Sequence, residues 1–532
     1  MNDLPHEYDM SNTSVNPSQR TQTQILFGLV GAISTAIAFD VSVYRGHGYS
    51  GWAFFFAGSL LAYFVATLKT KSHPVSWLVA FLILLTTLRL VWLGTPFQCV
   101  LGLFLLATYG MTRNGMVPYL SSLWIYCFQS CFAVLSTLRD LIILSPHTNR
   151  KINHVTLLTI FLPACAVVVF GGIFIAANPD LVKWTEEIFI SATKWLEGMN
   201  PAESLCFLTI FWLAAGQILP WLNAIKKYSS DLFSERVEEE AAIIESDLYS
   251  PIRNTLIAVN GLFVLYLVFE FQTLWFRELP KGFYYAGYAH QGAGWLTFAL
   301  ALATAMLSLI FRGSILDDPR LSKLKNLAWV WSAANMLLAI SVMNRMWIYI
   351  DFNGMTRMRV VGLFGIATVV IGFLIVIWKI RAQKNFIWLL HRQLWAFVLA
   401  IYCLTMTPVD YLIHTYNANQ ILNGNLAPAV QITEHPVNLS GWLALVPLLD
   451  CEDEIIRDGV RARLESIMAN NGSLSDSRRQ SDDDFKHWTS YQIVRQQLLD
   501  QFVKTGLSVE ARGRQAPIDE WEKFKEYAYQ WY

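Results

Sequence analysis

The stretch RVVGLFGIATVVIGFLIVIWKI, residues 359–380, decides the fold class of this 532-residue chain. No charged residue lies between Arg359 and Lys379, so the stretch is long and apolar enough to cross a bilayer as a helix. Similar runs recur along the chain, and we expect an all-α, polytopic transmembrane helix bundle of about eleven or twelve spans. The expected spans are residues 24–43, 50–68, 75–93, 96–111, 117–137, 154–177, 202–222, 254–276, 286–311, 326–347, 359–380 and 393–414.

The composition supports a membrane location. Hydrophobic residues make up 54% of the chain and charged residues only 15%, whereas soluble domains carry about 25% charged residues. Lys plus Arg and Asp plus Glu both total 40, so the zero net charge gives no indication of a nucleic-acid partner, and we expect none. The 7 cysteines form no Cys-x-x-Cys pair, and we expect no metal site, cofactor or disulfide framework.

The segment 75–111 is compatible with two different topologies. Only Gly94 and Thr95 separate its two apolar runs, and Pro96 opens the second and shorter one. The segment therefore forms either two spans or one span with an interfacial piece.

The positions of Lys and Arg predict the orientation of the bundle. Basic residues are frequent in every second loop from residue 138 onward and sparse in the alternate loops. We expect the basic loops to face the cytoplasm of a bacterial inner membrane, with the C-terminal tail on the periplasmic face. Lys69, Lys71 and Arg113 do not fit this pattern if there are twelve spans.

The two ends of the chain differ from the bundle. Residues 1–23 are polar, resemble no signal peptide and are expected to be disordered. The bundle is expected over 24–416, and a soluble region of short helices over 417–532 with a flexible linker near 470–486. Amphipathic runs on both sides of this linker make the C-terminal region the candidate surface for a protein partner.

No catalytic signature occurs in the chain: we find no His-Glu-x-x-His, no phosphate-binding Gly-rich loop and no Gly-x-Ser-x-Gly. We therefore name no catalytic residue, and an enzyme is disfavoured without being excluded. Ionisable residues inside spans are costly and become functional candidates by default. The membrane-embedded charges are Asp40, Arg89 and Glu270, each near the end of its span and within reach of the interface.

The densest group of polar residues falls in two outward-facing segments, 277–292 and 344–359. Gly354 is placed to supply a turn with positive φ, and Thr356 to cap the following helix. If the two segments are neighbours, their side chains converge at the outer mouth of the bundle and bind an anionic ligand; alternatively, Arg345 pairs with Asp351 or Glu278 and only locks two hairpins together. The members of this outer cluster are Tyr288, His290, Gln291, Arg345, Tyr349, Asp351, Thr356 and Arg359.

The same two segments carry a resemblance. Leu279–Gly282 with Tyr288–Gly292, and Arg345, Tyr349, Gly354–Thr356 and Arg359, resemble the Leu-Pro-x-Gly…Tyr-Ala-His-x-Gly and Arg-x3-Tyr-x4-Gly-(Leu/Met)-Thr-x2-Arg segments of a family of bacterial multi-pass membrane proteins. That family is known only as a domain of unknown function. The resemblance extends over most of residues 25–468, with lesser matches at Asp40, at Ala177–Pro179, and at Asp410 with Tyr416–Asn417. It implies a bacterial inner-membrane location and transfers no activity.

Three functions remain open at this stage. The first is a small-solute transporter, which requires a water-filled cavity reaching Arg345 or Glu270. The second is a non-catalytic membrane scaffold, sensor or assembly protein, in which those side chains are paired with each other. The third is an intramembrane transferase that uses His290 with Asp351.

Overall fold

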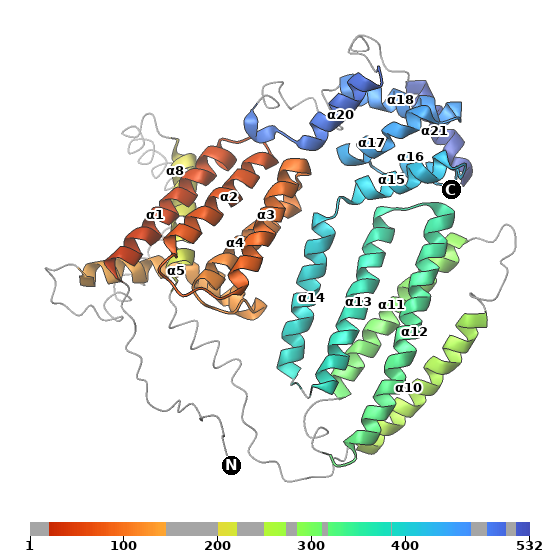
Figure 1. The fold of residues 1–532 in the computed structure, drawn as a ribbon, viewed down its shortest axis with the longest axis horizontal. Coiled ribbons are helices and arrows are strands. Elements are labelled where there is room, and N and C mark those ends of the chain that lie inside the picture. Colours follow the sequence, from red (N-terminus) through yellow and green to blue (C-terminus); the bar gives the residue numbers. More distant parts are fainter. Residues whose placement is uncertain are drawn as a thin grey trace, which may run out of the picture. The chain divides into compact units, whose positions relative to one another are not determined.

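The computed structural model describes residues 21–144, 200–220, 249–272, 285–310, 318–382, 384, 386–469, 487–506 and 518–531. Every regular element within these ranges is helical, which confirms the all-α polytopic bundle (Figure 1). Eight segments in this part of the chain are long and apolar enough to cross a membrane, so the protein is a multi-pass integral membrane protein. They are Gln22–Tyr44, Tyr49–Ala66, Val75–Leu93, Pro201–Ile218, Tyr249–Glu270, Leu321–Asn353, Arg357–Arg381 and Trp388–Met406.

The other expected spans are shorter, partly described or outside the described residues. Helices α4 (Pro96–Arg113), α5 (Leu120–Leu144) and α11 (Tyr285–Ile310) form at three of the predicted positions. The predicted span 154–177 lies outside the described residues, as do the linker 470–486 and residues 1–20 of the expected disordered N-terminus.

The chain divides into two compact units, and the first holds residues 1–87 and 102–232. In it α1 (Gln22–Phe39) packs on α2 (Tyr49–Ala66) and α8 (Pro201–Ile218). The backbones approach closely at small residues, because a Cβ on Gly31 would lie 2.7 Å from Ala66 Cβ. Thr21 closes a capping box with Gln24, so the first helix begins two residues before the predicted span.

The segment 75–111 forms a pair of helices. Helix α3 (Val75–Leu93) and α4 run antiparallel, because His73 N, just before α3, donates to Thr112 O near the end of α4 at 2.8 Å. Arg113 is buried at the end of α4, where its Nε donates to Thr67 Oγ1 at 2.8 Å and its guanidinium lies over Phe64. Arg113 therefore stabilises the end of α2, and its charge is satisfied by protein groups instead of by water in an exposed loop.

The second unit holds residues 88–101 and 233–532. Its membrane part is a bundle of α10 (Tyr249–Glu270), α11, α12 (Leu321–Asn353), α13 (Arg357–Arg381) and α14 (Phe386–Met406). Trp331 and Phe373 lie in a buried apolar core. The outer faces remain apolar and exposed, as at Leu265 with 69% of its surface accessible, which is the pattern of lipid-facing helices.

A compact helical domain follows the bundle within the second unit, and we call it the C-terminal domain (Figure 1). Its core joins side chains from helices far apart in the sequence, including Trp442, Val460, Leu498 and Phe524. Its elements are α15 (Val409–Leu422), α16 (Ala429–Thr433), α17 (Leu439–Leu445), η5 (Val446–Asp450), α18 (Glu454–Ala469), η6 (Trp488–Ser490), α20 (Ile493–Lys504), α21 (Ile518–Ala528) and η8 (Tyr529–Trp531).

Two predicted helix boundaries differ from those in the structure. The expected span 393–414 is interrupted at Pro408, because proline has no N–H to continue the helical ladder. Helix α15 therefore begins at Val409 and packs on α17, so the expected division at 416/417 falls inside it. In addition, α12 runs on to Asn353, so most of the segment expected as a loop at 344–359 is helix.

Candidate functional site

A buried ion pair joins α10 to α12. The guanidinium of Arg345 is bidentate on Glu270: its Nε donates to Oε1 at 2.6 Å and its Nη2 donates to Oε2. Ser341 Oγ donates to Glu270 Oε1 at 2.7 Å and Tyr266 OH to Oε2 at 2.9 Å. Side-chain exposure is only 5% for Arg345 and 0% for Glu270. The carboxylate thus accepts four hydrogen bonds, and the pair is electrically neutral within the bundle.

This pair gives Arg345 the partner that was expected of a scaffold, sensor or assembly protein, in place of the two partners proposed for it in the outer cluster. The alternatives considered were an anionic ligand, Asp351 or Glu278, and Glu278 lies outside the described residues. Glu270 was expected among the membrane-embedded charges and Arg345 in the outer cluster, and only the scaffold hypothesis joined the two. Tyr266 and Glu270, like Ser341 and Arg345, are four residues apart, so each charge has a hydroxyl on the same face of its own helix.

The turn between α12 and α13 holds the C-terminal domain. Gly354 has φ +81°, and Thr356 accepts from Arg359 N to cap α13, which confirms both predictions. Asn417 of α15 binds both polar groups of the Met355 backbone, because its Oδ1 accepts from Met355 N at 2.7 Å and its Nδ2 donates to Met355 O at 3.0 Å. The turn is therefore fixed to α15 by backbone recognition.

A second arginine–carboxylate pair lies beside this turn. Arg357 is bidentate on Asp410 of α15, with Nε donating to Oδ1 at 2.6 Å and Nη2 donating to Oδ2. The Asp410 carboxylate also accepts from the backbone N of Asn438, just before α17, at 3.1 Å. Asp410 thus links α13, α15 and α17. Sequence reasoning did not select Arg357, and Asp410 entered only as a minor motif match.

Only some members of the outer cluster meet. Arg359 is buried, lies 3.8 Å from the Tyr349 ring centroid and donates to Gly354 O, so it stabilises the turn next to Thr356. Asp351 is exposed and contacts Tyr416 of α15. The backbones of Tyr288, His290 and Gln291 lie near the start of α11, and their side chains lie outside the described ones.

Asp40 and Arg89 lie at helix ends. Asp40 begins the π-helix η1 (Asp40–Tyr44) and pairs with Arg45 at 3.2 Å. Arg89 Nη1 donates to Leu93 O at 2.6 Å, its Nε donates to Met406 O at 3.3 Å, and its guanidinium lies over Trp92. Both charges therefore have partners near the ends of their helices.

The turn after α3 also contacts the C-terminal domain within the second unit. Gln492, just before α20, donates to Leu90 O at 3.1 Å and accepts from Gly94 N at 2.7 Å. Trp92 packs edge-on against Tyr411 of α15. The C-terminal domain is therefore fixed at two places, the α12–α13 turn and the α3–α4 turn.

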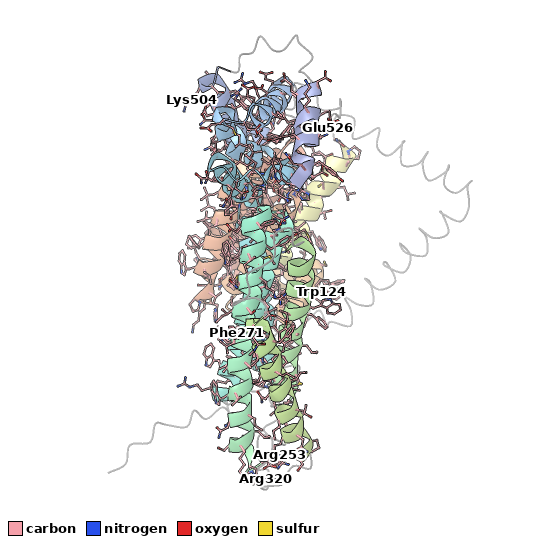
Figure 2. The ribbon with its side chains drawn as sticks, turned by 90° about the vertical axis from the view of Figure 1, so that its right-hand side faces the viewer. Trp124, Arg253, Phe271, Arg320, Lys504 and Glu526 are labelled. Atoms are coloured by element: carbon pink, nitrogen blue, oxygen red, sulfur yellow. The ribbon has the colours of Figure 1, made fainter. Side chains whose placement is uncertain are left out.

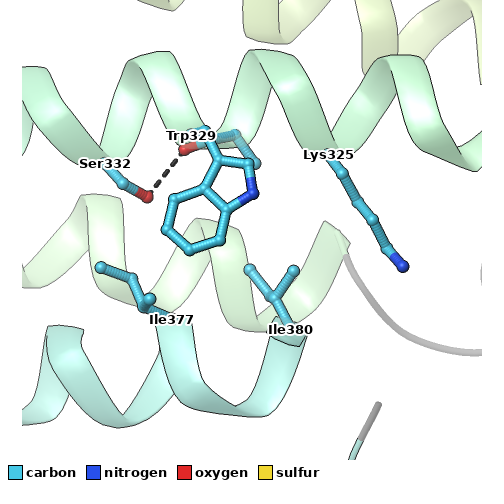
Figure 3. Close-up of a pocket in the computed structure, with 6 residues that line it drawn as sticks. Lys325, Trp329, Ser332, Ile377 and Ile380 are labelled. Carbon is cyan, nitrogen blue, oxygen red and sulfur yellow. Dashed lines mark hydrogen bonds between the residues drawn. The ribbon is translucent and has the colours of Figure 1, made fainter. Parts of the chain in front are cut away.

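Among the residues that the structure describes, neither the hollow between α12 and α13 nor a group of metal ligands adds a site beside the two ion pairs. Figure 3 shows a hollow between α12 and α13 of about 10 Å³, the volume of roughly one water. The Ser332 hydroxyl in this hollow donates to Ala328 O of its own helix. In the part of the chain that the structure describes, no three His, Cys, Asp or Glu side chains gather as metal ligands.

The family can now be stated from comparison with known proteins. A family model described as a domain of unknown function, DUF4153, matches residues 74–433, more than half of the chain. The chain belongs to the DUF4153 family. No curated protein and no solved structure matches the chain. The DUF4153 match runs from the start of α3 through α16, and so includes both ion pairs and the turn fixed to α15.

His414 gives the junction a dependence on pH. It is 3% exposed on α15, and its Nδ1 finds no hydrogen-bond partner among the described residues. Burial lowers its pKa to about 4; Asp410 opposes this shift, and Arg357 and His435 add to it. A lowered histidine pKa means that the unfolded chain takes up a proton first as pH falls, so stability decreases from about pH 6.5 toward 4.

We predict that acidification over this range costs the C-terminal domain about 3 kcal/mol through His414. The variant His414→Gln should lose less stability between pH 7 and pH 4.5, measured as the denaturation midpoint in detergent micelles. The matched control is His47→Gln at an exposed histidine of the other unit. An unchanged acid response in His414→Gln would contradict the assignment.

Proposed function

We propose that the protein is a non-catalytic membrane platform that presents its C-terminal domain to a protein partner. The observation that carries this proposal is the fixation of α15 to the bundle by Arg357–Asp410 and by Asn417 on Met355. Contacts of this kind fix the orientation of a domain, which a platform requires. The proposed partner is a protein that recognises the helical surface of the C-terminal domain. The lipid bilayer surrounds the helix bundle and is the second partner.

The Glu270–Arg345 pair supports a platform over a transporter. A transport pathway would leave these charges facing water, whereas each is satisfied by the other and by Ser341 and Tyr266. The transferase hypothesis lacks a comparable argument, because Asp351 contacts Tyr416 and the side chain of His290 is not among those described.

The distribution of Lys and Arg over the two ends of the bundle supports an orientation with the C-terminal domain on the periplasmic side. Arg253 and Arg320 lie at the end of the bundle opposite to Lys504 and Glu526 of the C-terminal domain (Figure 2). Lys323, Lys325, Arg381 and Arg392 lie in the terminal one or two turns of α12, α13 and α14 on the Arg320 side, and Lys384 lies between α13 and α14. By the positive-inside rule this end faces the cytoplasm, and the C-terminal domain faces the periplasm of a bacterial inner membrane.

One experiment tests both parts of the proposal. Alkaline phosphatase fused after Tyr532 should be active in a bacterial host, and fused after Lys384 it should be inactive. In the same full-length fusion, the double variant Glu270→Leu/Arg345→Leu should still complement a strain that lacks the gene. A platform requires α10 and α12 to pack correctly, but it does not require the charges of Glu270 and Arg345.

The results separate the hypotheses. If the double variant accumulates normally but does not complement, the platform proposal is wrong, and a transport pathway that passes Glu270 and Arg345 is favoured. An inactive phosphatase after Tyr532 would reverse the orientation.

A further inference from the structure

A cavity in the first unit lies where the first membrane helix ends. It has a volume of about 440 Å³, within the usual range for small-ligand sites. Its polar lining comes from η1 and from the start of α8, and its apolar lining from the next turn of α8. The residues that line it are Asp40, Arg45, Asn200, Glu203, Ser204, Phe207 and Leu208.

The charges of the cavity are unbalanced. Arg45 Nε donates to Glu203 Oε1 at 2.7 Å and lies 3.2 Å from Asp40 Oδ2, so one guanidinium serves two carboxyl groups. Those two carboxyl groups also contact each other. Their side chains are only 15% and 24% exposed, whereas Arg45 is 63% exposed. A protonated amine entering the cavity would supply the second positive charge that two carboxyl groups and one guanidinium lack.

The backbone structure of η1 and of the start of α8 brings the polar lining residues of the cavity together. The π-helix turn at Asp40–Tyr44 contains an extra residue, an irregularity that recurs at functional sites. Asn200 caps α8 and donates to Tyr44 OH at 3.3 Å, which fixes the start of α8 to the end of η1. Tyr44 is also an aromatic residue at the end of a span, as is typical of the membrane–water interface.

The apolar wall indicates how a ligand would lie. Phe207 is partly buried, and Leu208 is 59% exposed on the outer surface of α8, where a membrane helix meets acyl chains. A ligand that fills the cavity therefore meets carboxylates and an arginine on one side and hydrocarbon on the other. An aminophospholipid has this arrangement, with an ammonium, a neighbouring phosphate and acyl chains.

We propose that this cavity binds a phosphoethanolamine group, with the ammonium between Asp40 and Glu203 and the phosphate on Arg45. The membrane aminophospholipid is the source that the apolar wall favours. This site is independent of the platform function, since it lies in the other unit.

The test uses the full-length protein purified in a neutral detergent. Phosphatidylethanolamine, phosphatidylcholine and phosphatidylglycerol with the same acyl chains are titrated separately and binding is measured by native mass spectrometry. We expect phosphatidylethanolamine to bind about tenfold more tightly than phosphatidylcholine, whose quaternary nitrogen donates no hydrogen bond. Competition by free phosphoethanolamine shows whether the ligand is soluble or a lipid. If free phosphoethanolamine competes as strongly as phosphatidylethanolamine does, the ligand is soluble; if it competes only weakly, the ligand is the lipid.

Variants make the test specific to the cavity. Glu203→Gln should abolish the preference for phosphatidylethanolamine, and Glu454→Gln, at an exposed carboxylate of the other unit, should preserve it. If Glu203→Gln does not accumulate, Asp40→Asn provides the same comparison. Equal binding of the three lipids, or a preference that persists in a folded Glu203→Gln protein, would overturn the proposal.

Discussion

Replacing Arg345 alone by leucine should destabilise the bundle by about 3–5 kcal/mol, because it leaves the Glu270 carboxylate buried without its counter-charge. Glu270→Leu should have a cost of similar size for the reverse reason. Removal of either partner also breaks a bidentate hydrogen bond in a region with no water to replace it. The measurement is the free energy of unfolding in mixed micelles, together with the amount of protein that accumulates in the membrane.

The double variant distinguishes a structural pair from a set of separate charges. Glu270→Leu/Arg345→Leu should recover most of the lost stability, since replacing both members of a buried ion pair by apolar residues is often neutral or stabilising by about 1–4 kcal/mol. The hydroxyls of Ser341 and Tyr266 lose an acceptor in this variant, which limits the recovery.

A matched control is available on α10 itself. Arg253→Leu removes an exposed arginine and should change stability by less than about 0.5 kcal/mol. If the two single variants at the pair cost no more than Arg253→Leu, or if their costs add in the double variant, Glu270 and Arg345 are not coupled as described.

The helical architecture followed from the sequence because membrane helices are specified locally. A run such as 359–380 must satisfy its backbone hydrogen bonds within itself, so hydrophobicity and length are enough to find it. The boundary at Pro408 was missed for a related reason: the apolar pattern continues through 393–414, and the chemistry of one proline decides where the helix ends.

The turn was predictable, whereas the Glu270–Arg345 pair was only one of several alternatives and the Arg357–Asp410 pair was not expected. Gly354 and Thr356 act on their own backbone neighbours, so their roles could be seen in the sequence. Glu270 and Arg345 are 75 residues apart in the chain, and Arg357 and Asp410 are 53 apart. Which charge meets which depends on helix packing, and no local periodicity carries that information.

Gly354→Ala should loosen the junction between bundle and C-terminal domain, at a cost of about 4 kcal/mol. The glycine has φ +81° and ψ −175°, a region that is essentially restricted to glycine. A Cβ there would lie 2.8 Å from Asn417 Oδ1 and 2.9 Å from Pro428 Cβ. The side chain therefore displaces the amide that binds the Met355 backbone, so backbone strain and steric overlap act together.

Gly424→Ala separates these two contributions. Gly424 has φ +90°, and a Cβ at this position meets nothing within 4 Å, so it reports backbone strain alone, about 1–2 kcal/mol. Hydrogen exchange of α15 in the intact protein is the direct measurement, because release of Asn417 should raise exchange there in Gly354→Ala and not in Gly424→Ala. Equal effects of the two substitutions would mean that the α12–α13 turn is strained but does not hold the domain. Fixation would then rest on the Arg357–Asp410 pair and on the contacts of Gln492 with the α3–α4 turn.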